Sequence, residues 1–259
     1  MTREAGPYAD VARELAGTPF GSISYVEETA STNADAAALL GDARFAGHTI
    51  VAEYQRHGAG RKGRSWEAAA GTALLFSTTL PREIGAERLW VVPFWVALAI
   101  RHALRECGVT TTLRWPNDLM LGDRKIAGVL CQSSVTGLTA RVACGVGINV
   151  YRWIDAETLV VPPPAFCDDL ANVDRRTLLR DILLEYQRTL SMLDDPARLS
   201  AEWNAAAELP GKRYRIQPDA GGAAFDASAQ GLADGGGLHV IRDDGTSQTI
   251  SLADARVLR

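Results

Sequence analysis

Residues Gly58 to Trp66 read GAGRKGRSW, which places three glycines, three cations and a tryptophan in nine residues. Glycines at this spacing let the backbone bend and approach a ligand closely, and Arg61, Lys62 and Arg64 suit an anion such as a phosphate. A strand-like run, residues 49–53, leads into the stretch, and another, residues 72–80, follows it. The sequence therefore predicts a cationic loop between two strands of a sheet.

Two phosphate-binding motifs fit this loop by their letters. Its three glycines satisfy G-x-G-x-x-G of dinucleotide-binding folds, and residues 58–65 differ in one position from a P-loop. Both motifs require a helix directly after the last glycine, with its N-terminus receiving the phosphate. Residues 66–70 leave room for little more than one turn before Gly71. We therefore expect neither motif. The glycines and Trp66 also disfavour a merely solvated basic loop.

The length and composition are ordinary for a soluble globular protein. Its 259 residues are 47% hydrophobic and 22% charged, with a formal net charge of −4. Such a charge creates no global field for nucleic acid or anionic membranes, so any cationic site is local. The N-terminus lacks the apolar core of a signal peptide, and the longest apolar stretch, Leu89 to Ile100, is too short to span a membrane. We expect a cytoplasmic protein without nucleic-acid or membrane partners.

The four cysteines have no C-x-x-C spacing, and the four histidines are scattered without ligand spacing. This pattern is typical of free thiols in a reducing cytoplasm and argues against a His/Cys metal site.

The first strand is expected over residues 22–26, and an alanine-rich helix over residues 34–40. Between them lie Ser31, Thr32 and Asn33. Thr32 and Asp35 fit the S/T-x-x-D/E capping pattern, so one interpretation of these residues is a helix cap. Three consecutive small polar residues at a helix N-terminus also suit a ligand, and both interpretations remain open.

A long helix is expected over residues 87–107, then a strand, residues 110–115, that ends in the polar turn Pro116-Asn117-Asp118. The next strand, residues 125–132, begins with Lys125. Strict alternation puts Lys125 on the same face as Ala127, Val129 and Cys131. It is either an exposed strand end or a functional cation. Gly128 indicates that something approaches this strand closely.

A third central strand, residues 139–150, carries Gly145, Gly147 and Asn149. Two helices follow, over residues 174–193 and 196–209. Beyond them the composition changes to short strand-like runs separated by glycine turns, which predicts a small β-barrel or hairpin module. We therefore expect two domains, residues 1–209 and residues 210–259.

Four pieces together carry a family resemblance. They are Ser31-Thr32-Asn33, the loop from Gln55 to Trp66, W-P-N-D (115–118) with K-I-A-G (125–128), and G-V-G-I-N (145–149). In this order and spacing the chain resembles the biotin protein ligases, the biotin–[acetyl-CoA-carboxylase] ligase family, over roughly residues 21–259. The combination of W-P-N-D, K-I-A-G and G-x-G-I-N is specific, although each motif alone is weak.

The resemblance implies an α+β fold: a mixed-sheet catalytic domain related to class II aminoacyl-tRNA synthetases, with a small C-terminal β-barrel. It also implies a two-step reaction. Biotin's carboxylate attacks the α-phosphate of Mg-ATP, giving biotinyl-5′-AMP, and a lysine of a biotin carboxyl carrier protein, as in acetyl-CoA carboxylase, then takes the biotin. The implied small molecules are therefore biotin, ATP and Mg²⁺.

Site residues follow from the matching positions. Implied catalytic residues are Lys125, for the biotin carboxylate and α-phosphate, Arg61, folding over the adenylate, and Asp118, for binding Mg²⁺ or taking a proton from the incoming lysine. The implied biotin contacts are Ser31, Thr32, Asn33, Gln55, Ala59, Gly60, Arg61, Lys125 and Gly128. The implied nucleotide contacts are Arg61, Arg64, Trp66, Asn117, Lys125 and Asn149.

The sequence departs from the family pattern at Ala59, where the family loop commonly carries arginine, and after Trp66, where a usual proline and asparagine are missing. Some members carry an N-terminal DNA-binding domain, for which we expect no room here. Lipoate ligases and octanoyltransferases share the fold, but the basic loop with Trp66 and the C-terminal module favour biotin. The basic patch alone would also suit a nucleic-acid-binding module, which the acidic net charge disfavours. The presence of Lys125 disfavours a carrier-binding module without activity.

Overall fold

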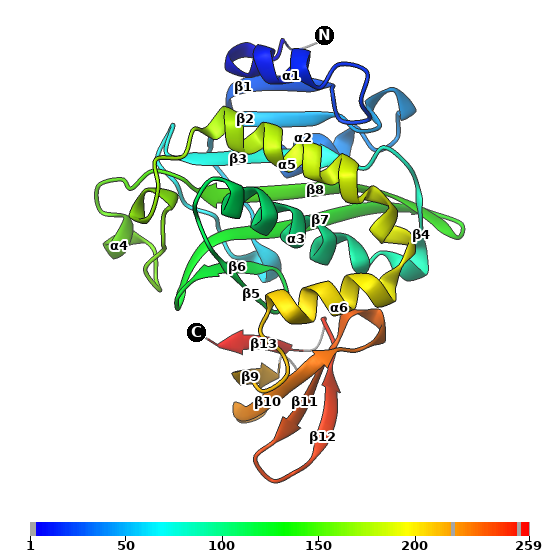
Figure 1. Cartoon of the computed structure of the whole chain (residues 1–259), viewed down its shortest axis with the longest axis vertical. Helices are drawn as coiled ribbons and strands as arrows, with labels where there is room; N and C mark the ends of the chain where they lie inside the picture. The colour runs from blue at the N-terminus through cyan, green and yellow to red at the C-terminus, as the bar shows by residue number, and fades with distance from the viewer. Residues whose placement is uncertain (1–3, 219–220, 253–254, 259) are drawn as a thin grey trace.

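The computed structural model of the chain describes residues 4–218, 221–252 and 255–258. Its centre is an eight-stranded sheet with the order β1-β2-β3-β8-β7-β6-β5, in which β4 pairs with β8 (Figure 1). Among the described strands of this sheet only β1 and β2 run parallel, so the sheet is mixed, as expected. Its strands are β1 (Ile23–Thr29), β2 (Thr49–Gln55), β3 (Ala73–Thr79), β4 (Ile84–Gly85), β5 (Thr112–Arg114), β6 (Asp118–Leu121), β7 (Arg124–Thr136) and β8 (Thr139–Asn149).

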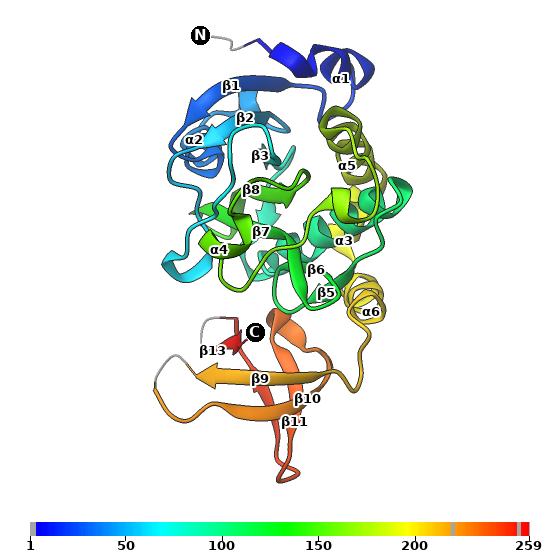
Figure 2. The same ribbon diagram turned by 90° about the vertical axis from the view of Figure 1, so that its left-hand side faces the viewer.

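Helices cover both faces of this sheet. The helices are α1 (Ala9–Glu14), α2 (Thr32–Ala38), α3 (Val91–Glu106), α4 (Ala156–Leu159), α5 (Arg175–Thr189) and α6 (Pro196–Ala206). Figure 2 shows α2 on one side of the sheet and α3 with α5 on the other. Among the helices of the described residues, none is long and apolar enough to cross a membrane.

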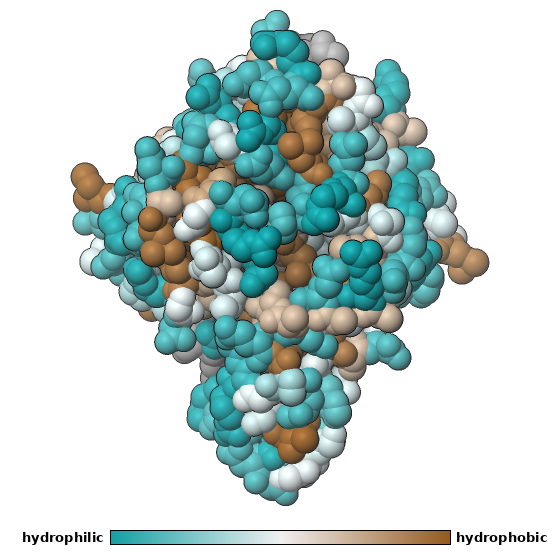
Figure 3. Space-filling view, in the orientation of Figure 1, coloured by the Kyte–Doolittle hydropathy of each residue, from teal (hydrophilic) through white to brown (hydrophobic). Residues whose placement is uncertain are grey.

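The main core lies between the sheet and the helices α3 and α5. Trp95 of α3 and Tyr186 of α5 are buried there, with ring centroids 4.6 Å apart. The outer surface of this layer is mostly hydrophilic (Figure 3), as expected of amphipathic helices whose apolar sides face a sheet. A smaller cluster of Ala36, Leu40, Ile50 and Ala143 packs under α2.

Most predicted elements are confirmed, with shifted ends. The expected helix over residues 87–107 begins only at Val91, because a 3₁₀ turn precedes it, and Pro93 lies in its first turn, where proline is tolerated. The expected helix over residues 174–193 ends at Thr189 and continues as a 3₁₀ turn. Asp174 caps its N-terminus by accepting hydrogen bonds from two backbone N–H groups.

The C-terminal segment forms a separate five-stranded antiparallel sheet at one end of the molecule, next to α6 (Figures 1 and 2). Its strands are β9 (Arg213–Pro218), β10 (Phe225–Leu232), β11 (Leu238–Arg242), β12 (Ser247–Ile250) and β13 (Ala255–Leu258). The order β12-β11-β10-β9-β13 leaves β12 and β13 unpaired with each other among the described residues. The expected small β-barrel is therefore not confirmed, because the sheet is open.

Candidate active site

The candidate site lies on the α2 face of the large sheet, over a floor made by three glycines. Gly128 of β7 pairs with Gly147 of β8, and Gly145 lies two residues before Gly147 on the same face. A methyl group on Gly147 would lie 2.5 Å from Trp66 Cε2, and one on Gly145 would lie 2.8 Å from Asn33 Cγ. One on Gly128 would lie 2.6 Å from Lys125 Nζ. Each glycine thus makes room for one candidate side chain.

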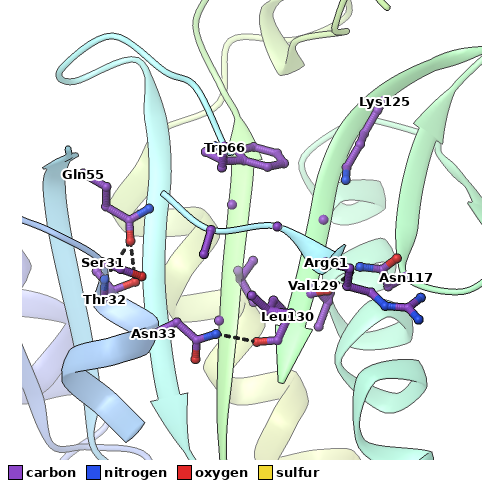
Figure 4. A pocket seen from close by; sticks show the side chains of 16 residues that line it. Ser31, Thr32, Asn33, Gln55, Arg61, Trp66, Asn117, Lys125, Val129 and Leu130 are labelled. Atoms are coloured by element: carbon purple, nitrogen blue, oxygen red, sulfur yellow. Dashed lines mark hydrogen bonds between the residues drawn. The ribbon is translucent and has the colours of Figure 1, made fainter. Parts of the chain in front are cut away.

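Ser31, Thr32 and Asn33 form the buried N-terminal end of α2, above this floor (Figure 4). Of the two interpretations left open, the cap formed by Thr32 with Asp35 is contradicted, because Thr32 is the first residue of α2 rather than its cap. Ser31 occupies the cap position and makes no side-chain capping hydrogen bond, while Asp35 accepts a hydrogen bond from Thr29. The Gln55 side chain does the capping instead, since its Oε1 accepts from both Thr32 N at 2.7 Å and Thr32 Oγ1 at 2.9 Å.

Two polar atoms in the site are buried without a hydrogen-bond partner among the described residues. They are Asn33 Oδ1 and Trp66 Nε1. Asn33 Nδ2 donates to Leu130 O at 3.0 Å, which fixes the amide with its oxygen unpaired (Figure 4). An unpaired buried polar group costs about 1–3 kcal/mol, so both atoms are favourable positions for a ligand's donor and acceptor.

The cationic loop folds back on itself rather than opening a helix. Trp66 N donates to Gly58 O, and Gly60 N donates to Arg64 O, so the loop closes as a narrow turn. Residues 61–63 form one 3₁₀ turn, with Lys62 in the left-handed region at φ 57°. The absence of an α-helix in this described segment agrees with excluding the dinucleotide and P-loop motifs.

Within this loop the candidate residues occupy different environments. Arg61 lines the cavity and donates from Nη2 to Leu252 O, which follows β12 of the C-terminal segment, at 2.6 Å. Ala59, Gly60 and Trp66 also line the cavity. Arg64 is exposed and does not line it. Its nucleotide contact stays a prediction.

Lys125 reaches the site because β7 is irregular. The register of β6 with β7 shifts between the pairs Leu119–Ala127 and Met120–Lys125, so one extra residue stands in β7. Strict alternation of Lys125 with Ala127 is therefore wrong, and Lys125 shares the face of Gly128 instead. Its Nζ lies 2.6 Å from Asp118 Oδ1 and 5.4 Å from the Trp66 ring centroid. The side chain is only 20% exposed, so it is no solvated strand end.

The two asparagines expected to contact the nucleotide differ in position. Asn117 lines the cavity and donates from Nδ2 to Val129 O. Asn149 is buried and does not line the cavity. Its Nδ2 donates to Ala165 O at 3.1 Å and to Lys125 O at 3.4 Å. Asn149 thus ties the segment after β8 to the backbone of Lys125, and its nucleotide contact stays a prediction.

The cavity that these residues enclose is small, about 50 Å³, because the Trp66 indole lies over Gly147 and beside Gly128. A neighbouring cavity of about 330 Å³ shares Arg61, Asn117, Val129 and Leu130 with it. The predicted site residues do not include Val129, Leu130, Val146, Gly145 or Gly147, although the two glycines belong to the G-V-G-I-N motif. Alternation from Gly128 could have indicated Leu130, and G-x-G in β8 could have indicated the two glycines.

Known proteins match this chain in sequence and fold. A model of the biotin/lipoate A/B protein ligase family matches residues 27–149. The biotin–[acetyl-CoA-carboxylase] ligase of Mycobacterium tuberculosis is 30% identical over 244 residues, which cover 87% of this chain and 88% of the relative. That of Paracoccus denitrificans is 31% identical over 236 residues, covering 87% and 96%.

Longer relatives match only in part. The aligned region spans 55% of the bifunctional ligase/repressor BirA of Escherichia coli, with 30% identity over 177 residues. Among solved structures, biotin protein ligase from Aquifex aeolicus in complex with biotin and ATP has a TM-score of 0.72 at 20% identity, covering 92% of this chain and 99% of that one. This likeness shows the fold. Identity of about 30% over nearly the whole length of two ligases shows more: the chain belongs to the biotin protein ligase family.

Proposed function

We propose that this protein activates biotin with ATP to biotinyl-5′-AMP and transfers the biotin to a lysine of a biotin carboxyl carrier protein. The observation that carries the proposal is the site itself. One cavity brings together three features from distant segments of the chain. They are the buried polar cluster at the N-terminus of α2, the glycine floor and the half-buried ammonium of Lys125. Relatives named as biotin ligases support the choice of biotin.

The polar end of the site suits the ureido ring of biotin, which offers two N–H donors and a carbonyl acceptor. Asn33 Oδ1 is an unpaired acceptor among the described residues, and Ser31 and Thr32 supply hydroxyl groups beside it. The glycine floor then gives the apolar part of biotin a flat surface leading toward Lys125. Ligand pockets usually enclose about 300–1,000 Å³ and this cavity holds about 50 Å³, so we infer that Trp66 moves off the floor when a ligand enters.

The first step brings two anions together, since a carboxylate oxygen attacks the α-phosphate. A bond forms between the carboxylate oxygen and the α-phosphorus. The bond between the α-phosphorus and the oxygen that bridges it to the β-phosphate breaks, and pyrophosphate leaves. Fixed cations where this charge develops lower the barrier, and this effect grows in a site shielded from water. We assign that task to Lys125, whose ammonium lies beside Gly128 of the floor. Arg61, which lines the same cavity, would then retain the adenylate.

The second step requires a neutral amine, whereas a free lysine titrates near ~10.4. The amine attacks the acyl carbon, an amide forms and AMP leaves. We assign Asp118 either to accepting the amine's proton or to binding Mg²⁺. The ion would arrive with ATP and neutralise its phosphates, and it is commonly held by one or two carboxylates together with phosphate oxygens. Asp118, whose Oδ1 lies 2.6 Å from Lys125 Nζ, is the carboxylate that would hold the ion in this site.

Three further assignments stay proposals: the division into domains 1–209 and 210–259, the relationship to class II aminoacyl-tRNA synthetases, and a cytoplasmic location. Two separate sheets support the division. Four free cysteines, two of them buried, support the location.

The proposed function is tested by incubating the protein with biotin, ATP, Mg²⁺ and a biotin carboxyl carrier domain. We expect a mass increase of one biotinyl group on the carrier, and none on a carrier whose acceptor lysine is changed to arginine. A mass increase with lipoate but not with biotin would contradict the proposal and favour the lipoate branch of the family.

A further inference from the structure

Trp115, the first residue of W-P-N-D, has no part in the proposed reaction. It is 1% exposed and lies in the large domain, but its polar contacts are with the C-terminal sheet. Its indole Nε1 donates to Gly236 O at 3.0 Å, and its backbone N lies 3.5 Å from the Tyr214 hydroxyl of β9. Both ends of one buried residue are thus fixed by a module of which no described residue lines the small cavity.

The contact with Gly236 depends on close approach. Gly236 has φ +77°, and a methyl group there would lie 2.7 Å from Phe94 Cε2 and 3.1 Å from Trp90 Cε3. The turn from Asp234 to Gly236 therefore inserts between α3 and Trp115. Only glycine combines this backbone conformation with this space.

Directly after Trp115 come the residues at the reaction end of the site. Asn117 lines the cavity and is fixed to Val129, and Asp118 pairs with Lys125. A shift of Trp115 would move this short turn, because one residue separates it from Asn117. A second connection points the same way, since Arg61 donates to Leu252 O of the same module.

We propose that Trp115 is a positioning residue through which the C-terminal sheet holds Asn117 and Asp118 in place against Lys125. The C-terminal module thereby belongs to the catalytic machinery without touching the reacting atoms. This inference rests on the proposed function. Misplacement of a reacting group by about 1 Å can lower the rate on the order of 100-fold. If loss of the hydrogen bond at Trp115 lets Asn117 and Asp118 shift, the rate of adenylate formation should therefore fall measurably.

The test compares Trp115→Phe with Trp203→Phe in the full-length protein. Both remove a buried indole near α3, but Trp203 Nε1 has no partner among the described residues, so only the first variant loses a hydrogen bond. Rates of biotin-dependent pyrophosphate exchange are divided by the concentration of active sites, counted from tightly held adenylate. We expect Trp115→Phe to lower kcat about 10- to 100-fold, and Trp203→Phe to leave it near wild type, at comparable melting temperatures.

A double-mutant cycle with Asp118 distinguishes positioning by Trp115 from a general loss of stability. In an Asp118→Asn background, Trp115→Phe should cost much less than in wild type, because both changes act on the same group. Equal costs in both backgrounds, or equal losses for the two tryptophan variants, would overturn the inference. If Trp115→Phe does not fold, Tyr214→Phe carries the same test, since it removes one hydroxyl. Absence of exchange in the wild-type protein would instead overturn the proposed function.

Discussion

Gly147→Ala is the sharpest test of the glycine floor, because the structure defines what the added methyl group meets. It would lie 2.5 Å from Trp66 Cε2 and within 2.9 Å of Cδ2 and Cζ2. Carbon atoms prefer separations of about 3.5–4.0 Å, so the indole would have to move by roughly 1 Å. The backbone of Trp66 resists this movement, since its N–H donates to Gly58 O at 2.8 Å.

The clash with Trp66 acts on the ligand-free site and by itself favours moving the indole off the floor. A methyl group forced against a bound ligand, in contrast, costs about 1–3 kcal/mol, which corresponds to roughly 5- to 150-fold in an equilibrium. If biotin lies on the floor after Trp66 has moved, the methyl group meets the ligand as well. We therefore expect the KM for biotin to rise by about that factor in biotin-dependent pyrophosphate exchange.

Gly41→Ala is the matched control, because a methyl group there has no neighbour within 4 Å and the residue is not in the left-handed region. We expect it to keep wild-type kinetics. An unchanged KM for Gly147→Ala would refute the assignment of the floor as the ligand surface. A lowered KM would also refute it, because the methyl group would then displace Trp66 without touching the ligand.

Three other predictions concern side chains around and away from this floor. Lys125→Ala should lower the rate of adenylate formation about 100- to 1,000-fold through loss of the fixed cation. A wild-type rate of pyrophosphate exchange in this variant would show that Lys125 takes no part in the reaction. The Arg61→Gly variant should release biotinyl-5′-AMP, which then biotinylates lysines of an added bystander protein. Biotinylation confined to the carrier would count against retention of the adenylate by Arg61. Burial lowers the pKa of His48, which lies between Ser22 and Ser24. The unfolded chain then binds the proton more readily, so the free energy of unfolding should fall as pH drops below about 6.5, and fall less in His48→Gln. Urea unfolding at several pH values measures this, and parallel curves for the two proteins would contradict it.

Much of the site could be predicted from the sequence because its residues stand in local motifs. Ser31 to Asn33, Gln55, Arg61, Trp66 and Lys125 all line one cavity in the structure. No local pattern indicates the spatial meeting of these segments, since they lie on β2, β7, a helix end and a loop. The family resemblance supplied that step.

The errors arose where long-range pairing decides the local structure. Lys125 faces the site because β7 gains an extra residue against β6, and strict alternation along one strand contains no signal for that bulge. Thr32 fits a capping pattern, but Gln55 at the end of strand β2 satisfies its N–H instead. Closure of the C-terminal sheet likewise depends on whether its two edge strands meet, which the spacing of its turns does not determine.

The contribution of Trp115 was also outside the reach of the sequence. Its apolar character predicts burial and its position in W-P-N-D indicates the site, but its partner Gly236 lies 121 residues further along the chain. In the sequence, the glycine turns of the C-terminal module resemble ordinary loops. Only the structure shows that one of these glycines, Gly236, packs against Phe94.

The central claim is that the cavity with Lys125 at one end and Ser31 to Asn33 at the other forms an acyl-adenylate from biotin. Exchange of labelled pyrophosphate into ATP tests it most directly, because exchange requires reversible adenylate formation and no carrier protein. We predict exchange that depends on biotin and does not occur with lipoate in its place. Exchange without biotin, or exchange supported by lipoate alone, would contradict the account.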